Sequence, residues 1–159
     1  MGIDVGDRWQ ELADKAEARI GHVGHPLLVP HLMMALAATG RGEAADRFLA
    51  ALRELAADTA LWTAPAIAEV ILPVCEAALA HCRGDYPRVV ELLAPRREQI
   101  RLLGGSNAQR DLFVQMLVDA AMKASRREIL GEVIAHEART RAIPPAERAG
   151  YAAAARWLA

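Results

Sequence analysis

The stretch that decides the fold is "IAEVILPVCEAALAHC", residues 67–82. Its apolar side chains recur in steps of three and four, which is the spacing of one face of an α-helix. They are Ile67, Val70, Ile71, Val74, Cys75, Ala78, Leu79 and Cys82. Pro73 lies inside this pattern and has no amide hydrogen, so we expect it to kink the helix rather than end it. The stretch therefore predicts one long helix with a buried face.

The same spacing appears on both sides of this helix. Residues 112–124 carry a second apolar stripe with a polar opposite face, as in an amphipathic helix. Weaker patterns predict helices around residues 9–20, 28–39, 45–56, 89–103, 129–134 and 144–157. The helix over 89–103 would contain Pro95, and the last would open at Pro144–Pro145. Because sustained apolar–polar alternation is lacking, we predict no sheet.

Short breaks separate these patterns, around residues 40–42, 83–85, 104–106 and 125–127. Short loops force neighbouring helices to run antiparallel as hairpins. Similar break-containing segments recur about every forty residues, a period typical of helical repeats. We therefore predict an all-α fold, a single domain over 1–159. Its roughly seven or eight helices would form antiparallel hairpins stacked in a short right-handed superhelix.

Composition limits the classes of function. Apolar residues make up 53% of the 159 residues, and the formal net charge is −1. The densest basic patch, Arg96, Arg97 and Arg101, is interrupted by Glu98 and is typical of a solvated helix face, so we predict no nucleic-acid partner. The N-terminus lacks a signal pattern and charges interrupt the apolar runs. We therefore predict a cytoplasmic protein without a membrane partner.

The two cysteines give no catalytic prediction. Cys75 and Cys82 lie seven residues apart on one predicted helix face, a rise of about 10 Å, which is too far for a disulfide. We expect both to be small buried hydrophobes rather than activated thiols. The sequence also lacks a nucleophile elbow and a phosphate-binding P-loop. We therefore predict a protein that is not an enzyme and carries no cofactor.

The stretch "LGGSNAQRDLF", residues 103–113, has a local structural interpretation. Gly104 or Gly105 can adopt the left-handed conformation that closes a helix. Ser106 then fits an N-cap, and Gln109 three residues later completes a capping box. Asp111, early in the new helix, is favoured by the helix dipole. These residues therefore predict the end of one helix and the start of the next.

Asn107 and Arg110 are not explained by capping, and two interpretations stay open. Both lie in the first helical turn, where free amides attract anions, and Arg110 would add a forked donor for a carboxylate or phosphate. Alternatively, Arg110 ties the loop to a neighbouring hairpin through an Asp or a carbonyl. We weigh the structural interpretation above the binding one.

Residues 84–121, "GDYPRVVELLAPRREQIRLLGGSNAQRDLFVQMLVDAA", resemble the tetratricopeptide repeat protein 38 family, also grouped as StaR-like proteins. Family members carry a Gly-Asp-Tyr turn, then a "GGS.AQRD" motif and an amphipathic helix. Upstream, "VGDRWQELADKAEARI" and "HLMMALAATGR" look like the preceding family helices. The resemblance covers most of the chain and corresponds to the C-terminal part of a longer pattern. It implies a tetratricopeptide-like stack of helical hairpins.

One position departs from the family pattern. The family usually has an Asp two residues before the histidine that corresponds to His31, where this chain has Val29. An Asp–His pair is therefore missing. The resemblance brings no established reaction. A hydroxylase role has been suggested for StaR-like proteins, but no cofactor motif in this sequence supports one.

Two further groups of side chains have weaker predictions. His22, His25 and His31 cluster in sequence, but their spacing matches no recognised metal site, so we predict no metal. Trp62, in "LWTAP", is expected to fill the space between hairpins, with lining of the concave groove as the alternative. We interpret Met33, Met34 and Met116 as core filling rather than binding surface.

The sequence therefore predicts a non-catalytic scaffold for protein interaction. Its concave face would hold a peptide, a partner helix or a small anionic ligand. The residues expected on that face are His31, Asn107, Arg110 and Asp111. The alternative is a self-association module, a homodimer formed through the tail "YAAAARWLA" with Tyr151, Trp157 and Leu158. A metal- or flavin-dependent enzyme is the third hypothesis.

Overall fold

The computed structural model describes residues 6–22 and 25–159. Residues 1–5, which include the start of the predicted domain and of the first upstream motif, and 23–24 lie outside the described residues. Within that description the chain is all helical, without strands. The α-helices are α1 (Arg8–Glu17), α2 (Leu28–Ala38), α3 (Gly42–Ala57), α4 (Ala64–Ala66), α5 (Leu72–Cys82), α6 (Tyr86–Leu93), α7 (Asn107–Lys123), α8 (Arg127–Thr140) and α9 (Ala152–Leu158). The all-α prediction is confirmed.

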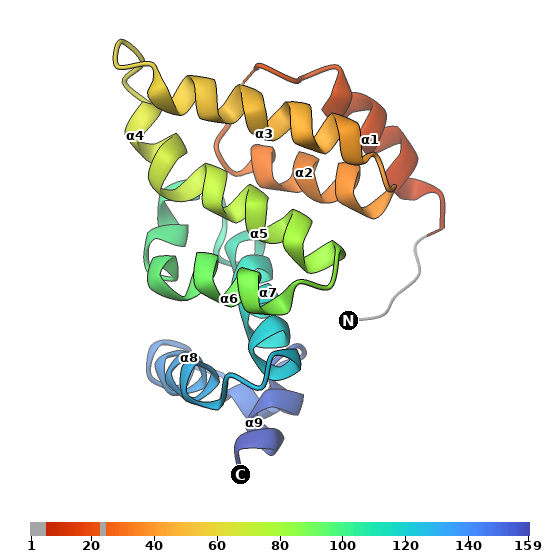
Figure 1. The fold of residues 1–159 in the computed structure, drawn as a ribbon. Helices are drawn as coiled ribbons and strands as arrows, with labels where there is room; N and C mark the ends of the chain where they lie inside the picture. The colour runs from red at the N-terminus through yellow and green to blue at the C-terminus, as the bar shows by residue number, and fades with distance from the viewer. Residues whose placement is uncertain (1–5, 23–24) are drawn as a thin grey trace.

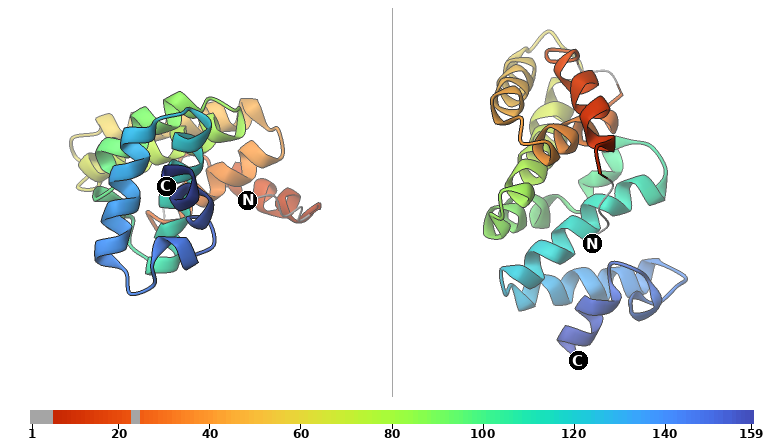
Figure 2. Two further views of the ribbon diagram at one scale, coloured as in Figure 1. Left: turned by 90° about the horizontal axis from the view of Figure 1, so that it is seen from below. Right: turned by 90° about the vertical axis from the view of Figure 1, so that its right-hand side faces the viewer.

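Most of the helices pack against the helix that precedes or follows them in the chain. The chain turns back between α2 and α3 and again between α5 and α6 (Figure 1). Contacts join each of α1, α2, α5, α6, α7 and α8 to a neighbour in sequence, and α5 also packs against α2, α3 and α7. Figure 2, right, shows the N-terminal helices at one end and α8 and α9 at the other. The predicted breaks at 40–42, 83–85, 104–106 and 125–127 all separate helices.

The helix predicted over 67–82 lies at the centre of the fold. A π-helical turn, η1 (Ile67–Ile71), joins α4 to α5, and the helical run continues from Ala64 to Cys82. Every member of the predicted apolar stripe is buried except Cys82. The helix thus continues through Pro73, as predicted. The prediction that Cys82 is buried is wrong, because it is the last residue of α5 and lies at the surface.

Arg96 compensates for the missing amide of Pro73. Proline cannot donate to the preceding helical turn, where the regular acceptor would be the carbonyl of Glu69. That carbonyl instead accepts a hydrogen bond from Nε of Arg96 (3.1 Å), whose Nη1 also donates to the carbonyl of Leu92 (3.0 Å). The wider π-helical turn lies directly before the proline. The side chain of Arg96, in the turn that follows α6, therefore supplies the donor that the carbonyl of Glu69 lacks because of the proline.

Three expectations about the helices are wrong. The segment 89–103 is not one helix: α6 ends at Leu93, and two 3-10 turns follow, η2 (Ala94–Arg96) and η3 (Gln99–Leu103). Pro95 lacks the amide hydrogen that would continue the hydrogen bonds of α6, which accounts for the end of that helix at Leu93. Pro144 opens only the 3-10 turn η4 (Pro145–Glu147), and α9 begins after Gly150, which has φ +86°. Trp62 fills no space between hairpins, because 89% of it is exposed at the turn before α4.

The helical run Ala64–Cys82 is long and apolar enough, by length and composition, to cross a membrane. This differs from the expectation that charges interrupt every apolar run. In the fold 56% of the most apolar window is buried against the other helices. A buried helix in the core of a protein can have the same length and apolar composition as a membrane-spanning helix.

Candidate functional site

The loop between η3 and α7 has the geometry that the sequence predicts. Gly104 and Gly105 both have positive φ, +75° and +70°. A Cβ on Gly105 would lie 2.2 Å from Cδ2 of Leu27, and φ +70° is strained for a residue with a side chain, so glycine is favoured at this position. Ser106 Oγ accepts from the amide of Gln109 (3.3 Å), and Gln109 Oε1 accepts from the amide of Ser106 (2.9 Å). The predicted capping box is confirmed.

The side chain of Arg110 folds back onto this loop. Its Nη1 donates to the carbonyls of Gly104 (2.9 Å) and Gly105, and its Nη2 donates to Oδ1 of Asn107 (2.5 Å). These bonds supply donors for the carbonyls of the two glycines with positive φ. Arg110 thus bonds to backbone carbonyls, as the structural interpretation expects. The carbonyls belong to the loop directly before α7, however, and not to a neighbouring hairpin. An anion-binding role for Asn107 and Arg110 stays a prediction.

Asp111 is held in a polar network with the C-terminal segment. Its Oδ1 accepts from Nη2 of Arg148 (2.9 Å) and from the hydroxyl of Tyr151 (2.6 Å), and its Oδ2 accepts from Nε2 of Gln115 (2.7 Å). Arg148 also donates to Glu137 (2.7 Å), which is only 4% exposed. Burial, followed by the nearby Asp111, raises the pKa of Tyr151 well above its ordinary value, so Tyr151 stays a neutral donor.

This network corrects the expected role of the tail. Tyr151 was predicted at a dimer interface, but it is fully buried and bonded to Asp111. Trp157 is 39% exposed, and its ring lies 5.1 Å from the guanidinium carbon of Arg127. Arg127 also donates to the carbonyls of Trp157 (3.0 Å) and Leu158 (2.7 Å). The tail is therefore bound to its own chain through contacts that the sequence does not reveal.

His31 lies apart from the other three predicted site residues. Its Nδ1 is 2.7 Å from the carbonyl oxygen of Leu27, and its ring packs edge-on against Phe113 with the centroids 5.3 Å apart. It lines a pocket with His25, Leu27, Leu28, Gly105 and Gln109. Asn107, Arg110 and Asp111 line a different cleft. The four predicted residues therefore do not form one site.

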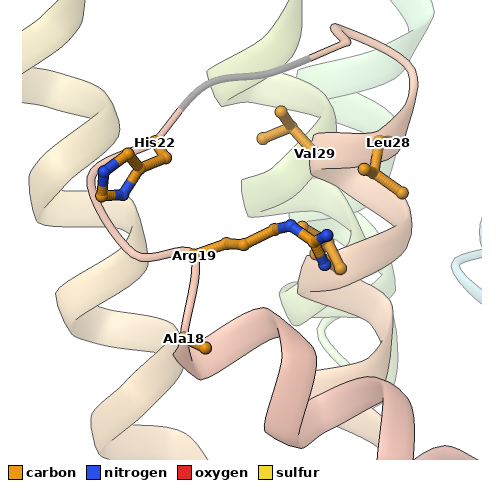
Figure 3. A pocket seen from close by; sticks show the side chains of 6 residues that line it. Ala18, Arg19, His22, Leu28 and Val29 are labelled. Atoms are coloured by element: carbon orange, nitrogen blue, oxygen red, sulfur yellow. The ribbon is translucent and has the colours of Figure 1, made fainter.

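The three clustered histidines do not converge either. His22 lines a separate pocket with Arg19 and the start of α2, in which Arg19 extends toward α2 (Figure 3). His25 and His31 share the pocket described above. In the part of the chain that the structure describes, no group of three His, Cys, Asp or Glu side chains is placed to hold a metal ion.

The most apolar groove lies between α1, α2, α5 and α7, with α9 at its edge. It has a volume of about 340 Å³. Methionines from three positions share its wall with Trp9 and several small residues; the lining includes Met34, Met116, Met122, Trp9, Ala38, Ala78, Leu112 and Ala153. Met33 is a buried core residue, but the interpretation of Met34 and Met116 as core filling alone is incomplete, because both also line this groove.

A polar cluster forms one side of this groove. Nε2 of His81 lies 2.7 Å from Oδ2 of Asp119, and Nζ of Lys123 lies 2.8 Å from the same oxygen. Burial acts to raise the pKa of Asp119, but the hydrogen bonds from Lys123 and His81 outweigh it and lower the pKa below its ordinary value. Lys123 also lies over the ring of Tyr86, 4.6 Å from its centroid. The groove thus has a mainly apolar lining and, on one side, a carboxylate that is paired with His81 and Lys123.

Sequence reasoning missed this groove because five separated segments build it. The available signal was the polar face of residues 112–124, on which Gln115 and Asp119 lie, together with the methionines. No family model matches the chain, and no solved structure matches it. The resemblance carried by residues 84–121 therefore stays a prediction.

Proposed function

We propose that this chain is a non-catalytic binding scaffold whose methionine-lined groove holds the apolar face of a partner helix. In this proposal the hairpins stack as a tetratricopeptide-like right-handed superhelix, and the groove is its concave face. The observation that carries the proposal is the lining of the groove by Met34, Met116 and Met122 from two different helices. Methionine is flexible and polarizable, which suits a surface that must adapt to another protein's side chains.

The shape and charge of the groove favour a helix as the partner. A volume of about 340 Å³ is at the lower end for small-molecule sites, and it suits a few apolar anchors spaced three or four residues apart on a helix. The charged groups beside it, Asp119 and Lys123, already neutralise each other. Apolar contact would therefore supply most of the affinity, while the polar side would fix the orientation of the partner.

Methionine-methyl NMR would test this proposal. The probe is a synthetic helical peptide with leucines at positions i, i+3, i+4 and i+7, added to protein labelled at the methionine methyl carbons. We expect the signals of Met34, Met116 and Met122 to shift, because their side chains line the groove. The signal of Met33, which is fully buried, is the internal control and should not shift.

A matched pair of variants sharpens the test. Met122→Lys places a charge in the apolar groove and should weaken peptide binding by about tenfold or more. Leu102→Lys introduces the same charge at a half-exposed apolar residue outside the groove and should leave binding unchanged. Equal weakening by both variants would contradict the proposal. So would methionine shifts that depend on protein concentration without peptide, because a second copy would then be the occupant.

A further inference from the structure

A second cleft, separate from the methionine-lined groove, is bordered by four arginines. It lies between η3, the start of α7 and the end of α8, and it has a volume of about 340 Å³. The guanidinium groups come from three segments of the chain; they belong to Arg97, Arg101, Arg110 and Arg141. Ile100 and Val114 add apolar wall. The sequence places these arginines up to 44 positions apart, so only the fold brings them to one cleft.

Several donors in this cleft have no acceptor. Arg97 binds Glu132 through Nη1 (3.1 Å), but its Nε is buried and has no hydrogen-bond partner among the residues that the structure describes. The side chain of Arg101 makes no hydrogen bond or ion pair within residues 6–22 and 25–159. A buried guanidinium N–H without an acceptor is costly, and proteins usually satisfy such groups. The cleft therefore offers cationic donors that the described chain does not use.

Two of the three acidic side chains that line this cleft already have partners within the chain. Asp111 accepts from Arg148, Tyr151 and Gln115. Glu137 accepts from Arg148 and pairs with Arg141 (3.5 Å). Glu98, which is exposed at the edge of the cleft, is the lining carboxylate without a partner among the described residues. The exposed guanidinium of Arg101 and the partly exposed end of the Arg97 guanidinium are thus open to an oxygen-rich anion from outside the chain, whereas the buried Nε of Arg97 is not.

We propose that this cleft binds a small molecule through a phosphate dianion, with Arg97 and Arg101 as its main ligands. Arginine presents paired N–H donors that match phosphate oxygens, which makes it the residue most suited to this role. Val114, which is partly exposed, contacts the carbon part of the ligand. Glu98 opposes binding by like-charge repulsion and sets the affinity. The site is independent of the methionine-lined groove and shares no lining residue with it.

Titration calorimetry with the full chain tests this proposal, using inorganic phosphate and phenyl phosphate as probes. Arg101→Gln should weaken binding by about tenfold or more, because one charge-assisted donor pair is lost. Arg101 is exposed and makes no side-chain bond in the described structure, so this variant keeps its fold. Arg47→Gln, an exposed arginine on α3, removes the same charge far from the cleft and should leave binding within about twofold.

The carboxylate gives a test of opposite sign. Glu98→Gln should strengthen phosphate binding by about threefold to tenfold, since it removes a like charge beside the site. Tighter binding of phenyl phosphate would assign an organic phosphate, and equal binding would assign free phosphate. The proposal is overturned if the wild-type chain shows no saturable binding of either probe, or if Arg47→Gln weakens binding as much as Arg101→Gln does.

Discussion

Asp119 accepts hydrogen bonds from His81 and Lys123 at the side of the methionine-lined groove, and its pKa lies below the ordinary value. A carboxyl group whose pKa is lowered in the folded state stabilises the fold above its unfolded pKa, and this contribution is lost as pH falls through the folded value. Asp119→Asn should therefore destabilise the protein by a constant amount above about pH 5. The difference should shrink below about pH 4.

Urea unfolding of the wild type and Asp119→Asn between pH 6 and pH 2.5 measures this dependence. Glu43→Gln, which removes an exposed carboxylate at the start of α3, is the control for the loss of one negative charge. A difference in unfolding free energy that persists unchanged at low pH would show that Asp119 acts through packing rather than through charge.

At the scale of the element, Pro73 and Arg96 act as a pair. Arg96→Ala should cost about 1 kcal/mol of stability, because the carbonyl of Glu69 loses its donor. In a Pro73→Ala background the backbone amide returns, so the same substitution should cost less. A double-mutant cycle by urea unfolding measures this coupling. Arg88→Ala, an exposed arginine on α6, is the control, and equal costs of Arg96→Ala in both backgrounds would contradict the pairing.

At the scale of the element, the sequence predicts the features that depend only on residues close together in the chain. The stripe around Val74 and the capping box of Ser106 and Gln109 follow from spacing alone, and both are confirmed. Spacing predicts a continuous helix through both Pro73 and Pro95. The helix continues through Pro73 but ends before Pro95, although both residues lack the amide hydrogen. The difference lies in a tertiary contact: Arg96, in the turn that follows α6, donates to the carbonyl of Glu69 before Pro73, and spacing does not show this.

The candidate site was harder to predict than the helices. Arg110 and Asp111 stand out in the sequence as polar side chains at the start of a helix. In the structure Arg110 bonds to the adjacent loop, and Asp111 bonds to Arg148, 37 residues later. The groove residues Trp9 and Met122 carry no motif, because their importance comes from neighbours far along the chain. Long-range proximity of this kind depends on how the helices pack, which no local pattern encodes.

At the scale of the whole molecule, Asp111 and Tyr151 join α7 to the last segment. Tyr151→Phe should destabilise the protein by about 2 kcal/mol, because a buried carboxylate loses a hydrogen bond. In an Asp111→Asn background the penalty should be smaller. Urea unfolding of the two single variants and the double variant gives the coupling energy. Additive effects would mean that the two side chains contribute independently despite their 2.6 Å contact.

The same network decides whether the chain can be shortened. Arg148 neutralises Asp111 on α7 and Glu137 on α8, and both of these carboxylates are largely enclosed by the fold. A protease cut after Arg141 would strip away that counter-ion, leaving the carboxylate of Asp111 without a cation and that of Glu137 with Arg141 alone. The C-terminal segment is therefore an integral part of the folded unit, and removing it would loosen α7 as well as the end of α8.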